Sequence, residues 1–538
     1  MKRKRQYEAS YAGYVYDKPV TYWTPSDEVK NRLTKADLSV SETIEAGGMP
    51  IILEGTTAYV DAEDGHTVIE AISGMKKSIC CFMPLIYALA KANENMILTD
   101  PKGELYDRTA GYLKSHGYKV HCLDFRTMDK DFYNLLHYPA TTYRSGDKDK
   151  GLAMLSDMIN ALAEDQRHRA KDPFWPDTAA LWMNATGAIM LDTYPEIDQV
   201  NILNWSDYNV RKSAQIVEEY LIPKMPDGIV KSALKQCCTS AENTFRSILI
   251  TASSFLTMFN QNPRLAAMLS HSTFTLKDLL APKTALFFVT DDTTSTADPI
   301  LGMIISQIQT YLIDQAYHSP KGKLKTRTNF LLDEFASLPI PNMDKALATH
   351  RSRNIRYYLC VQSLALLKKR YDDPEALLSN CSSTLFLGST ELELLQQIET
   401  KLGMTDITPD GKTQPLCSQA ELMTLERTWT HKEAIYMNLS ENIRYCTMLP
   451  SIEAYNLGNH PTPSYSIIPP EVPVYSVSQF ATEVVNGKVR VPFSPPLKAK
   501  TPSSDKHRTH ISNSSAGSIE AALTAKFDEL FGPLDDDE

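Results

Sequence analysis

The sequence predicts an α/β fold in which a parallel sheet, covered by helices on both faces, is interrupted by an all-α region and followed by a disordered C-terminal tail. Short apolar segments of strand length alternate with helical patterns in two separate blocks. Between the blocks, residues 140–280 show helical patterns only. Beyond Leu449 the chain becomes rich in Pro, Ser, Thr and Lys, and ten of the 31 prolines lie beyond residue 460.

The first block begins after a polar and aromatic N-terminal region without periodicity. Its strand patterns lie at 67–72, 95–100 and 119–125. A buried helix is predicted at 76–92, and a second helix at 105–117 is closed by Gly117. In the second block, strands are predicted at 284–291, 328–334, 356–363 and 383–389, with helices at 298–317, before Arg353 and at 391–403. Because crossover helices connect parallel strands, both blocks are expected to contribute to one sheet.

These patterns predict five regions. They are an N-terminal polar region (1–54), the first part of the α/β domain (55–139), the all-α insertion (140–280), the second part of the α/β domain (281–449) and the tail (450–538). At the end of the tail, apolar residues from Ile519 to Phe531 form one helical stripe. Two interpretations of this terminal amphipathic helix remain open: it folds back on the body, or it docks on a partner.

Composition excludes several classes of protein. With 43% hydrophobic and 22% charged residues in 538, the chain is not disordered throughout, a coiled coil or collagen-like. Its net charge of −10 means that any nucleic acid must bind to a local basic surface. Nine cysteines without a CxxC pair, and histidines without HExxH spacing, predict reduced cysteines of a cytosolic protein and no metal cage of His and Cys.

No membrane segment is expected. The N-terminal MKRKRQYEAS is basic, but no apolar region of a signal peptide follows it. The longest apolar run, 78–90, contains Pro84 and is shorter than the roughly 20 residues that cross a bilayer. The chain is therefore expected in the cytoplasm, at the cytoplasmic face of the membrane only through partners.

The strongest chemical signal is FLLDEF, residues 330–335. An apolar strand that ends in Asp-Glu is typical of a Walker B segment. Asp333 would then hold Mg²⁺ on a nucleotide, and Glu334 would orient or deprotonate the attacking water. Taken alone, the segment is equally compatible with a strand that runs into an acidic loop.

A Walker B segment requires a phosphate loop, and the nearest candidate is Ala71-Ile-Ser-Gly-Met-Lys-Lys-Ser78. It lies between a predicted strand and a long helix, and Lys77 and Ser78 occupy the Lys and Ser/Thr positions of GxxxxGK[ST]. Both pattern glycines are replaced, by Ala71 and Lys76. A lysine adopts positive φ less readily than glycine, so the pattern alone is also compatible with an ordinary strand–turn–helix junction.

Three further positions have two interpretations each. Asp100 and Lys102 of DPKGE lie either at a helix start, with Asp100 as cap, or at the edge of the sheet near a nucleotide. Arg351 of HRSR is either part of a solvated helix end or an arginine finger for a neighbouring subunit. Gln362 is either a buried amide bonded to the backbone or a sensor of the γ-phosphate or attacking water.

Together these passages resemble a known family, the TraG/TraD-like coupling ATPases of conjugative type IV secretion. The resemblance extends over about residues 55–400. It rests on MILTDPKGELYDRTAGYLKSHGYKVHCLDF (96–125), on NFLLDEFASLPIPNMDKALATHRSRNIRYYLCVQSLALLKKRYDD (329–373), and on the spacing of KKSICCFMP (76–84) before DPKGE.

The resemblance implies a RecA-like P-loop NTPase domain interrupted by an all-α domain, in a homo-oligomeric, commonly hexameric ring. Its implied cofactors are ATP and Mg²⁺. Its implied partners are single-stranded DNA, the relaxase and relaxosome, and components of the secretion channel. Carried over by position, the site residues are Gly74, Lys77, Ser78 and Asp333 for nucleotide, Ser78 and Asp333 for Mg²⁺, and Glu334, Arg351 and Gln362 for catalysis.

Two departures from the family make this an atypical member: membrane helices are absent from the N-terminus, and the Walker A motif is degenerate. Two functions therefore stay open. One is a coupling protein that drives or assists DNA transfer as an ATPase. The other is a non-hydrolysing adaptor that recruits DNA or protein substrates. An NTPase unrelated to secretion is disfavoured by the DPKGE and RSRNI contexts. Basic segments such as 345–356 suit a DNA channel, although a solvated surface is the favoured interpretation.

Overall fold

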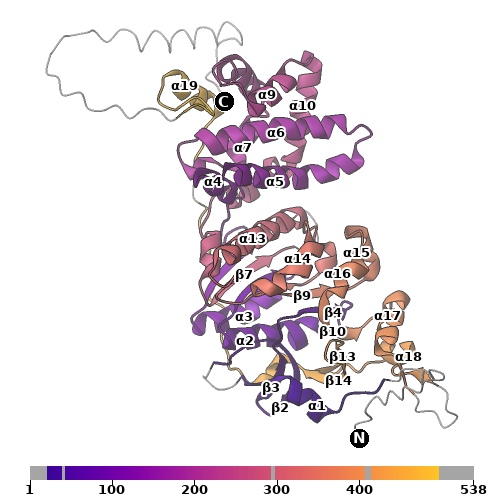
Figure 1. Ribbon diagram of the computed structural model, residues 1–538. Helices are drawn as coiled ribbons and strands as arrows, with labels where there is room; N and C mark the ends of the chain where they lie inside the picture. The colour runs from indigo at the N-terminus through magenta and orange to yellow at the C-terminus, as the bar shows by residue number, and fades with distance from the viewer. Residues whose placement is uncertain (1–20, 39–42, 292–296, 406–412, 470, 496–538) are drawn as a thin grey trace, which may run out of the picture. The chain divides into compact units, whose positions relative to one another are not determined.

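A nine-stranded sheet forms the core of the α/β part of the protein (Figure 1). The computed structural model describes residues 21–38, 43–291, 297–405, 413–469 and 471–495. The strand order is β14-β13-β10-β4-β9-β8-β5-β7-β6. The strands are β4 (His66–Ala71), β5 (Asn95–Asp100), β6 (Lys119–Asp124), β7 (Thr284–Val289), β8 (Thr328–Leu332), β9 (Ile355–Val361), β10 (Cys381–Gly388), β13 (His431–Asn438) and β14 (Ile443–Pro450).

The seven strands from β10 to β6 pair in parallel, and they coincide with the seven strands that the sequence predicts. Nearly all of their residues are buried, since helices cover both faces. Met96 and Leu98 of β5 pack in one cluster with α2 (Met83–Lys91) and α3 (Glu104–Ser115). On the opposite face, Tyr357 accepts a hydrogen bond from Gln309 of α13 (Asp298–His318). Both blocks thus build one sheet, as expected.

The helix predicted at 76–92 begins irregularly. A π-helical turn (Ser78–Phe82) precedes α2, and Pro84 follows as the second residue of α2. Proline has no amide hydrogen and its ring crowds the preceding turn, so a regular α-helix is unfavourable at this point. The irregular turn lies directly after Lys77, at the end of the candidate phosphate loop.

Smaller helices complete the α/β part. They are α14 (Met343–Thr349), α15 (Leu364–Arg370), α16 (Pro374–Ser379), α17 (Leu392–Leu402) and α18 (Gln419–Met423). A short antiparallel pair, β11 (Met404–Thr405) and β12 (Gln414–Pro415), follows α17. In the part of the chain that the structure describes, no helix combines the length and the apolar character needed to cross a membrane.

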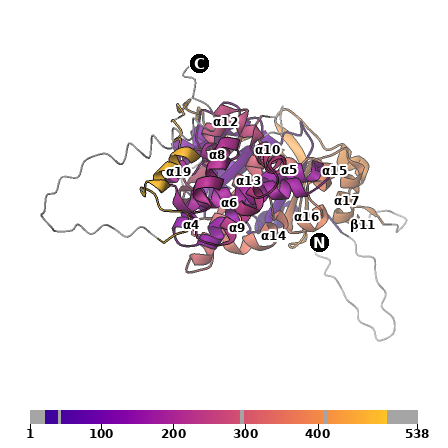
Figure 2. The same cartoon turned by 90° about the horizontal axis from the view of Figure 1, so that it is seen from above.

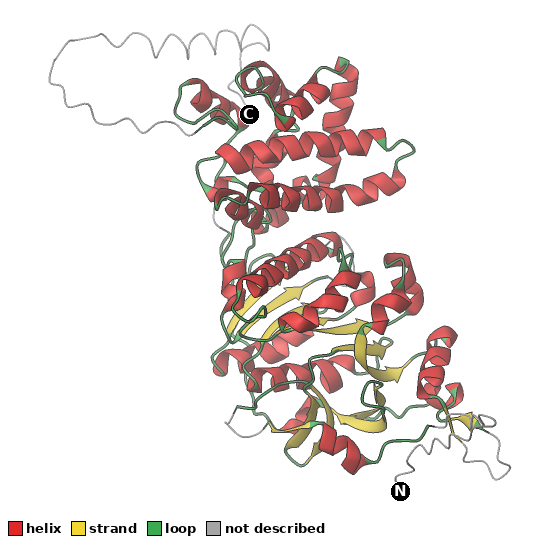
Figure 3. Cartoon of the chain, in the orientation of Figure 1, coloured by secondary structure: helices red, strands yellow, loops and turns green. Residues whose placement is uncertain are grey.

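Between β6 and β7 the chain forms helices and loops only (Figure 3). The helices are α4 (His137–Arg144), α5 (Lys148–Arg169), α6 (Phe174–Thr193), α7 (Ile202–Asp207), α8 (Arg211–Ile216), α9 (Ile229–Cys238), α10 (Glu242–Phe255), α11 (Thr257–Asn260) and α12 (Pro263–Met268). Buried Trp182 and Trp205 lie in the core of this helical insertion. The all-helical character expected for this insertion is thus found over His137–Met268, and a 3₁₀ turn (Leu276–Leu280) leads back to the sheet.

The N-terminal polar region contains structure that the sequence did not indicate. After α1 (Ser26–Arg32), a three-stranded antiparallel sheet forms in the order β1 (Thr34–Asp37), β3 (Thr57–Asp61), β2 (Met49–Glu54). A turn at Gly55, whose φ is +62°, joins β2 to β3. Because this sheet crosses the predicted boundary at residue 54/55, that boundary is wrong. No crossover helix separates these three strands, so the strand–helix alternation that marks the parallel strands is missing here.

The part of the predicted C-terminal tail that the structure describes is folded onto the body. The segment 456–494, called the strap below, is packed rather than disordered, and the compact unit of the chain extends to Ser494. Its helix α19 (Val477–Val485) lies beside α8 (Figure 2). Polar contacts hold both ends of the strap: Gly111 N donates to Thr462 Oγ1 (3.1 Å), and Arg490 pairs with Asp192 (2.7 Å). The stripe from Ile519 to Phe531 lies outside the described residues.

The strap escaped prediction because its contacts are not periodic. The ammonium groups of Lys114 and Lys130 make cation–π contacts with the ring of Tyr465, with their Nζ atoms 4.7 and 5.0 Å from the ring centroid. The backbone of Tyr475 donates to Asn204 Oδ1 (2.9 Å). An extended proline-rich segment is stabilised by such contacts with distant residues, which its own composition does not reveal.

Candidate nucleotide-binding site

The predicted site residues follow the carboxyl ends of neighbouring strands. The loop 72–77 follows β4, Gln362 follows β9 and Asp333 follows β8, while Asp100 is the last residue of β5. These four strands are neighbours in the order β4-β9-β8-β5. Because parallel strands end at the same edge, their following residues gather there. The structure brings together Lys77, Asp333, Glu334 and Gln362, while Arg351 lies elsewhere.

Lys77 and Asp333 form the centre of this site. Lys77 Nζ donates to Asp333 Oδ1 at 2.6 Å and lies 3.8 Å from Glu334 Oε1. The two side chains of the closer pair are only 12% and 8% exposed. Burial by itself lowers the pKa of Lys77, but the charge and hydrogen bond of Asp333 and the charge of Glu334 outweigh it, and the net shift is upward. Lys77 therefore stays cationic where a phosphate group would need it.

Glu334 is held in an unusual backbone conformation. Its φ is +56°, in the left-handed region, and its amide donates to Asp333 Oδ1 at 2.9 Å. Gln362 Nε2 donates to Glu334 Oε1 at 3.0 Å. The site thus contains a carboxylate that is 35% exposed and oriented by an amide from the neighbouring strand. Positive φ at a residue with a Cβ is unfavourable, and such conformations cluster at functional sites.

Two residues that the motifs did not identify support the site. Thr99 Oγ1, at the end of β5, donates to the carbonyl oxygen of Asp333 at 2.9 Å. Cys360, at 0% exposure on β9, has its pKa raised chiefly by burial and then by Asp333, so it stays a neutral thiol beside the carboxylate. Thr99 could have been found from the sequence as a polar residue near the end of a predicted parallel strand. Cys360 lies inside an apolar run and carried no such signal.

The loop 71–78 contains two residues in the left-handed region, Gly74 (φ +81°) and Lys76 (φ +59°). Lys76 thus has the backbone conformation for which the motif uses glycine. The loop is joined to the neighbouring strand by a hydrogen bond from Ile72 N to Gly388 O (3.3 Å). Lys77 is right-handed, and Ser78 then begins the π-helical turn. Loops with left-handed residues form concave arrays of amides that bind anions.

Arg351 lies at the other edge of the sheet. It belongs to a 3₁₀ turn (His350–Arg353) immediately before β9, so it is at the amino end of that strand while Gln362 follows the carboxyl end. Arg351 is exposed, and its charge acts on Glu63 and on His66, the first residue of β4. Arg351 therefore does not join the site of its own chain.

Asp100 makes the contact expected for a residue at a helix start, and it also ends β5 at the carboxyl edge of the sheet. Its Oδ2 accepts a hydrogen bond from Tyr106 N in the first turn of α3 (2.8 Å), although the residue before the helix is Gly103, with φ +73°. Burial raises the pKa of Asp100 from 3.8 to about 7. Lys102 is exposed. Asp100 thus stabilises the start of α3 behind the site.

Glu70, on the strand that leads into the loop, is fully buried, and neither carboxylate oxygen has a hydrogen-bond partner among the described residues. Burial raises its pKa from 4.5 to about 7. A carboxyl whose pKa is raised on folding stabilises the protein below its unfolded pKa, and this stability is lost as pH rises through 7.

We therefore expect the free energy of unfolding of Glu70→Gln to exceed that of the wild type by about 2 to 3 kcal/mol more at pH 8.5 than it does near pH 5. Urea unfolding midpoints across this range measure it. Asp100 titrates in the same pH range, but it does so in both proteins. The difference in stability between wild type and Glu70→Gln therefore reports on Glu70 alone. Exposed Glu375 provides the control Glu375→Gln, which should follow the wild type. Parallel pH profiles for wild type and Glu70→Gln would contradict the prediction.

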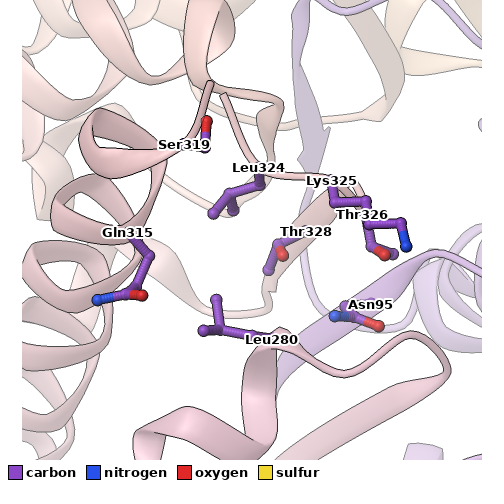
Figure 4. A pocket seen from close by; sticks show the side chains of 8 residues that line it. All are labelled: Asn95, Leu280, Gln315, Ser319, Leu324, Lys325, Thr326 and Thr328. Atoms are coloured by element: carbon purple, nitrogen blue, oxygen red, sulfur yellow. The ribbon is translucent and has the colours of Figure 1, made fainter. Parts of the chain in front are cut away.

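A separate cavity of about 180 Å³ lies at the amino edge of the sheet (Figure 4). Asn95 and Thr328, the first residues of β5 and β8, line it together with Gln315 of α13 and Lys325. Since the candidate site lies at the carboxyl edge, this cavity is not part of it.

Comparison with known proteins places the site in context. A model of the family described as "Type IV secretory system Conjugative DNA transfer" matches residues 23–444. Two Escherichia coli proteins named conjugal transfer protein TraG are 25% identical over 373 residues and 24% over 377. Each match covers 65% of this chain and 56% of the relative, so the chain spans just over half the length of these curated relatives.

Solved structures of the conjugative coupling protein TrwB share the fold. The unbound form has a TM-score of 0.58 and 14% identity, over 84% of this chain and 96% of TrwB. The complex of TrwB with ADP and Mg²⁺ has a TM-score of 0.58 and 16% identity, over 80% and 94%. The predicted RecA-like P-loop fold is therefore confirmed.

Proposed function

Because this chain belongs to the type IV secretory conjugative DNA transfer family, we propose that it is a coupling protein that binds ATP with Mg²⁺ and thereby drives or assists the transfer of single-stranded DNA. The DPKGE and FLLDEF passages predicted this membership, and the family match confirms it. The observation that carries the proposal is the buried contact of Lys77 with Asp333, beside Glu334 and Gln362.

The residues at the site fit a magnesium nucleotide. Lys77 would bind the phosphates, together with the loop amides around Gly74. The Ser78 hydroxyl and the Asp333 carboxylate supply the oxygen ligands that Mg²⁺ prefers. Bound Mg²⁺ would neutralise charge on the phosphates. Glu334, oriented by Gln362, would position or deprotonate water.

The position of Arg351 favours a ring. An exposed arginine at the amino edge cannot reach the carboxyl edge of its own sheet, but a neighbouring subunit that faces this edge could receive it. We therefore propose that Arg351 acts in a homo-oligomeric ring, hexameric as in the family, and completes the site of the adjacent subunit.

The remaining partners follow from the same proposal. Single-stranded DNA would contact basic residues such as Lys369 and Arg370, which are exposed on α15 just after Gln362. The protein would link the relaxase and relaxosome to the secretion channel, at the cytoplasmic face of the membrane through partners. A non-hydrolysing adaptor is the second candidate, favoured by the replacement of both loop glycines by Ala71 and Lys76.

Nucleotide binding and turnover test the proposal. Wild-type protein should bind a fluorescent ATP analogue only with Mg²⁺ and hydrolyse ATP faster with single-stranded DNA. Lys77→Ala should bind at least tenfold more weakly, because a charge-assisted contact with phosphate is lost. Lys488→Ala, which removes an exposed lysine of the strap, is the matched control. Binding without turnover at any protein concentration would establish the adaptor instead, and absence of binding would exclude a nucleotide function.

A further inference from the structure

The left-handed conformation of Lys76 needs an explanation. Glycine occupies this position in the motif because it adopts positive φ without a steric penalty, whereas a residue with a Cβ does not. Lys76 nevertheless has a φ of +59°, and right-handed Lys77 follows it. Since this turn directly precedes Lys77, and left-handed residues are typical of anion-binding loops, a structure that favours it would also favour phosphate binding.

A distant segment, Arg427–Trp429, contacts both left-handed residues of the loop. Arg427 Nη1 donates to Gly74 O at 2.8 Å. Lys76 Nζ donates to the main-chain oxygen of Trp429 at 2.9 Å and lies 5.6 Å from the centroid of its indole ring. Arg427 and Trp429 thus hold the loop at two points.

The segment 427–429 is itself fixed. It forms a tight turn before β13. In this turn the backbones of Arg427 and Lys432 pair in an antiparallel β-bridge, and Thr428 N donates to His431 O at 3.0 Å. Lys432 is fully buried, and its Nζ donates to the carbonyl oxygens of Leu425 and Glu426. In contrast, the Trp429 side chain is 93% exposed, so the segment does not serve to bury it.

We propose that the segment 427–429 takes over the role of the missing glycine. It holds Lys76 in the left-handed conformation and directs the Lys76 ammonium toward Trp429, away from Lys77. Arg427 and Trp429 are then positioning residues for the phosphate loop. The expected effect on phosphate binding rests on the proposed nucleotide function, but the restraint on the loop can be observed without nucleotide.

A double-mutant cycle with Arg427→Ala and Lys76→Gly tests this role. In the wild-type background, Arg427→Ala should weaken Mg²⁺-dependent binding of the fluorescent ATP analogue by about five- to tenfold. The loop then loses its hydrogen bond at Gly74, and the adjoining turn with Lys76 can relax to conformations with negative φ. In the Lys76→Gly background, the same substitution should change the affinity by less than about twofold, since glycine needs no restraint. Exposed Arg264 of α12 provides the control Arg264→Ala.

Hydrogen exchange of the 72–78 amides without nucleotide provides the independent measurement. Arg427→Ala should accelerate this exchange, and urea unfolding should show that the fold is intact. Unchanged loop exchange, or equal losses of affinity in both backgrounds, would overturn the positioning role. If the exchange changes as expected while no variant binds nucleotide, the restraint stands and the proposed nucleotide function fails.

Discussion

Replacement of Glu334 by glutamine is expected to lower DNA-stimulated ATP hydrolysis by at least 100-fold and to leave Mg²⁺-nucleotide binding within about twofold. General-base contributions are about 10²- to 10⁴-fold, and an amide cannot accept the proton. Glutamine keeps the size of the side chain and its oxygen as acceptor for Gln362 Nε2. Steady-state turnover with single-stranded DNA, beside equilibrium binding of the fluorescent analogue, measures both quantities.

The control is Glu471→Gln, an exposed glutamate of the strap. Wild-type turnover in Glu334→Gln would show that Glu334 is not the base. A joint loss of binding and turnover would show that its charge acts instead through Lys77, whose Nζ lies 3.8 Å from it.

Replacement of Arg351 by alanine is expected to lower turnover by about 10³-fold or more, the range of arginine fingers, without weakening nucleotide binding. The reason is geometric: Arg351 is exposed at the amino edge of β9, whereas Glu334 follows the carboxyl end of β8. In the proposed ring, Arg351 would therefore act on a neighbouring subunit. Turnover at saturating nucleotide and the state of assembly are measured together, because a failed ring would also lose activity.

Mixing two inactive variants gives the sharper result. When Arg351→Ala and Glu334→Gln subunits form one ring, some interfaces combine an intact Glu334 with an intact Arg351. At equal amounts and random assembly, roughly a quarter of the head-to-tail interfaces should be intact, so activity should return in part. Arg264→Ala mixed with Glu334→Gln is the reference for dilution by an active subunit. Assembled mixed rings without any recovery would exclude action of Arg351 on a neighbour.

The sheet was predictable because its strands are buried on both faces. Such strands form continuous apolar runs, and crossover helices separate them along the chain. The antiparallel β13 and β14 and the small N-terminal sheet were not predicted. The burial of β14 is uneven, and no crossover helices separate the antiparallel strands along the chain. The strap was mistaken for disorder, since its order depends on contacts such as Arg490 with Asp192.

The chain by itself determined which chemical groups can meet. Asp333, Glu334 and Gln362 follow strand ends, and Lys77 follows the first strand, so a parallel sheet must gather them at one edge. Only the tertiary structure decided which groups do meet and in what conformation. It brought Arg427 and Trp429 to the loop, where Lys76 adopts the conformation of a glycine. Backbone conformation at such a position depends on contacts 353 residues away along the chain, and no local pattern contains them.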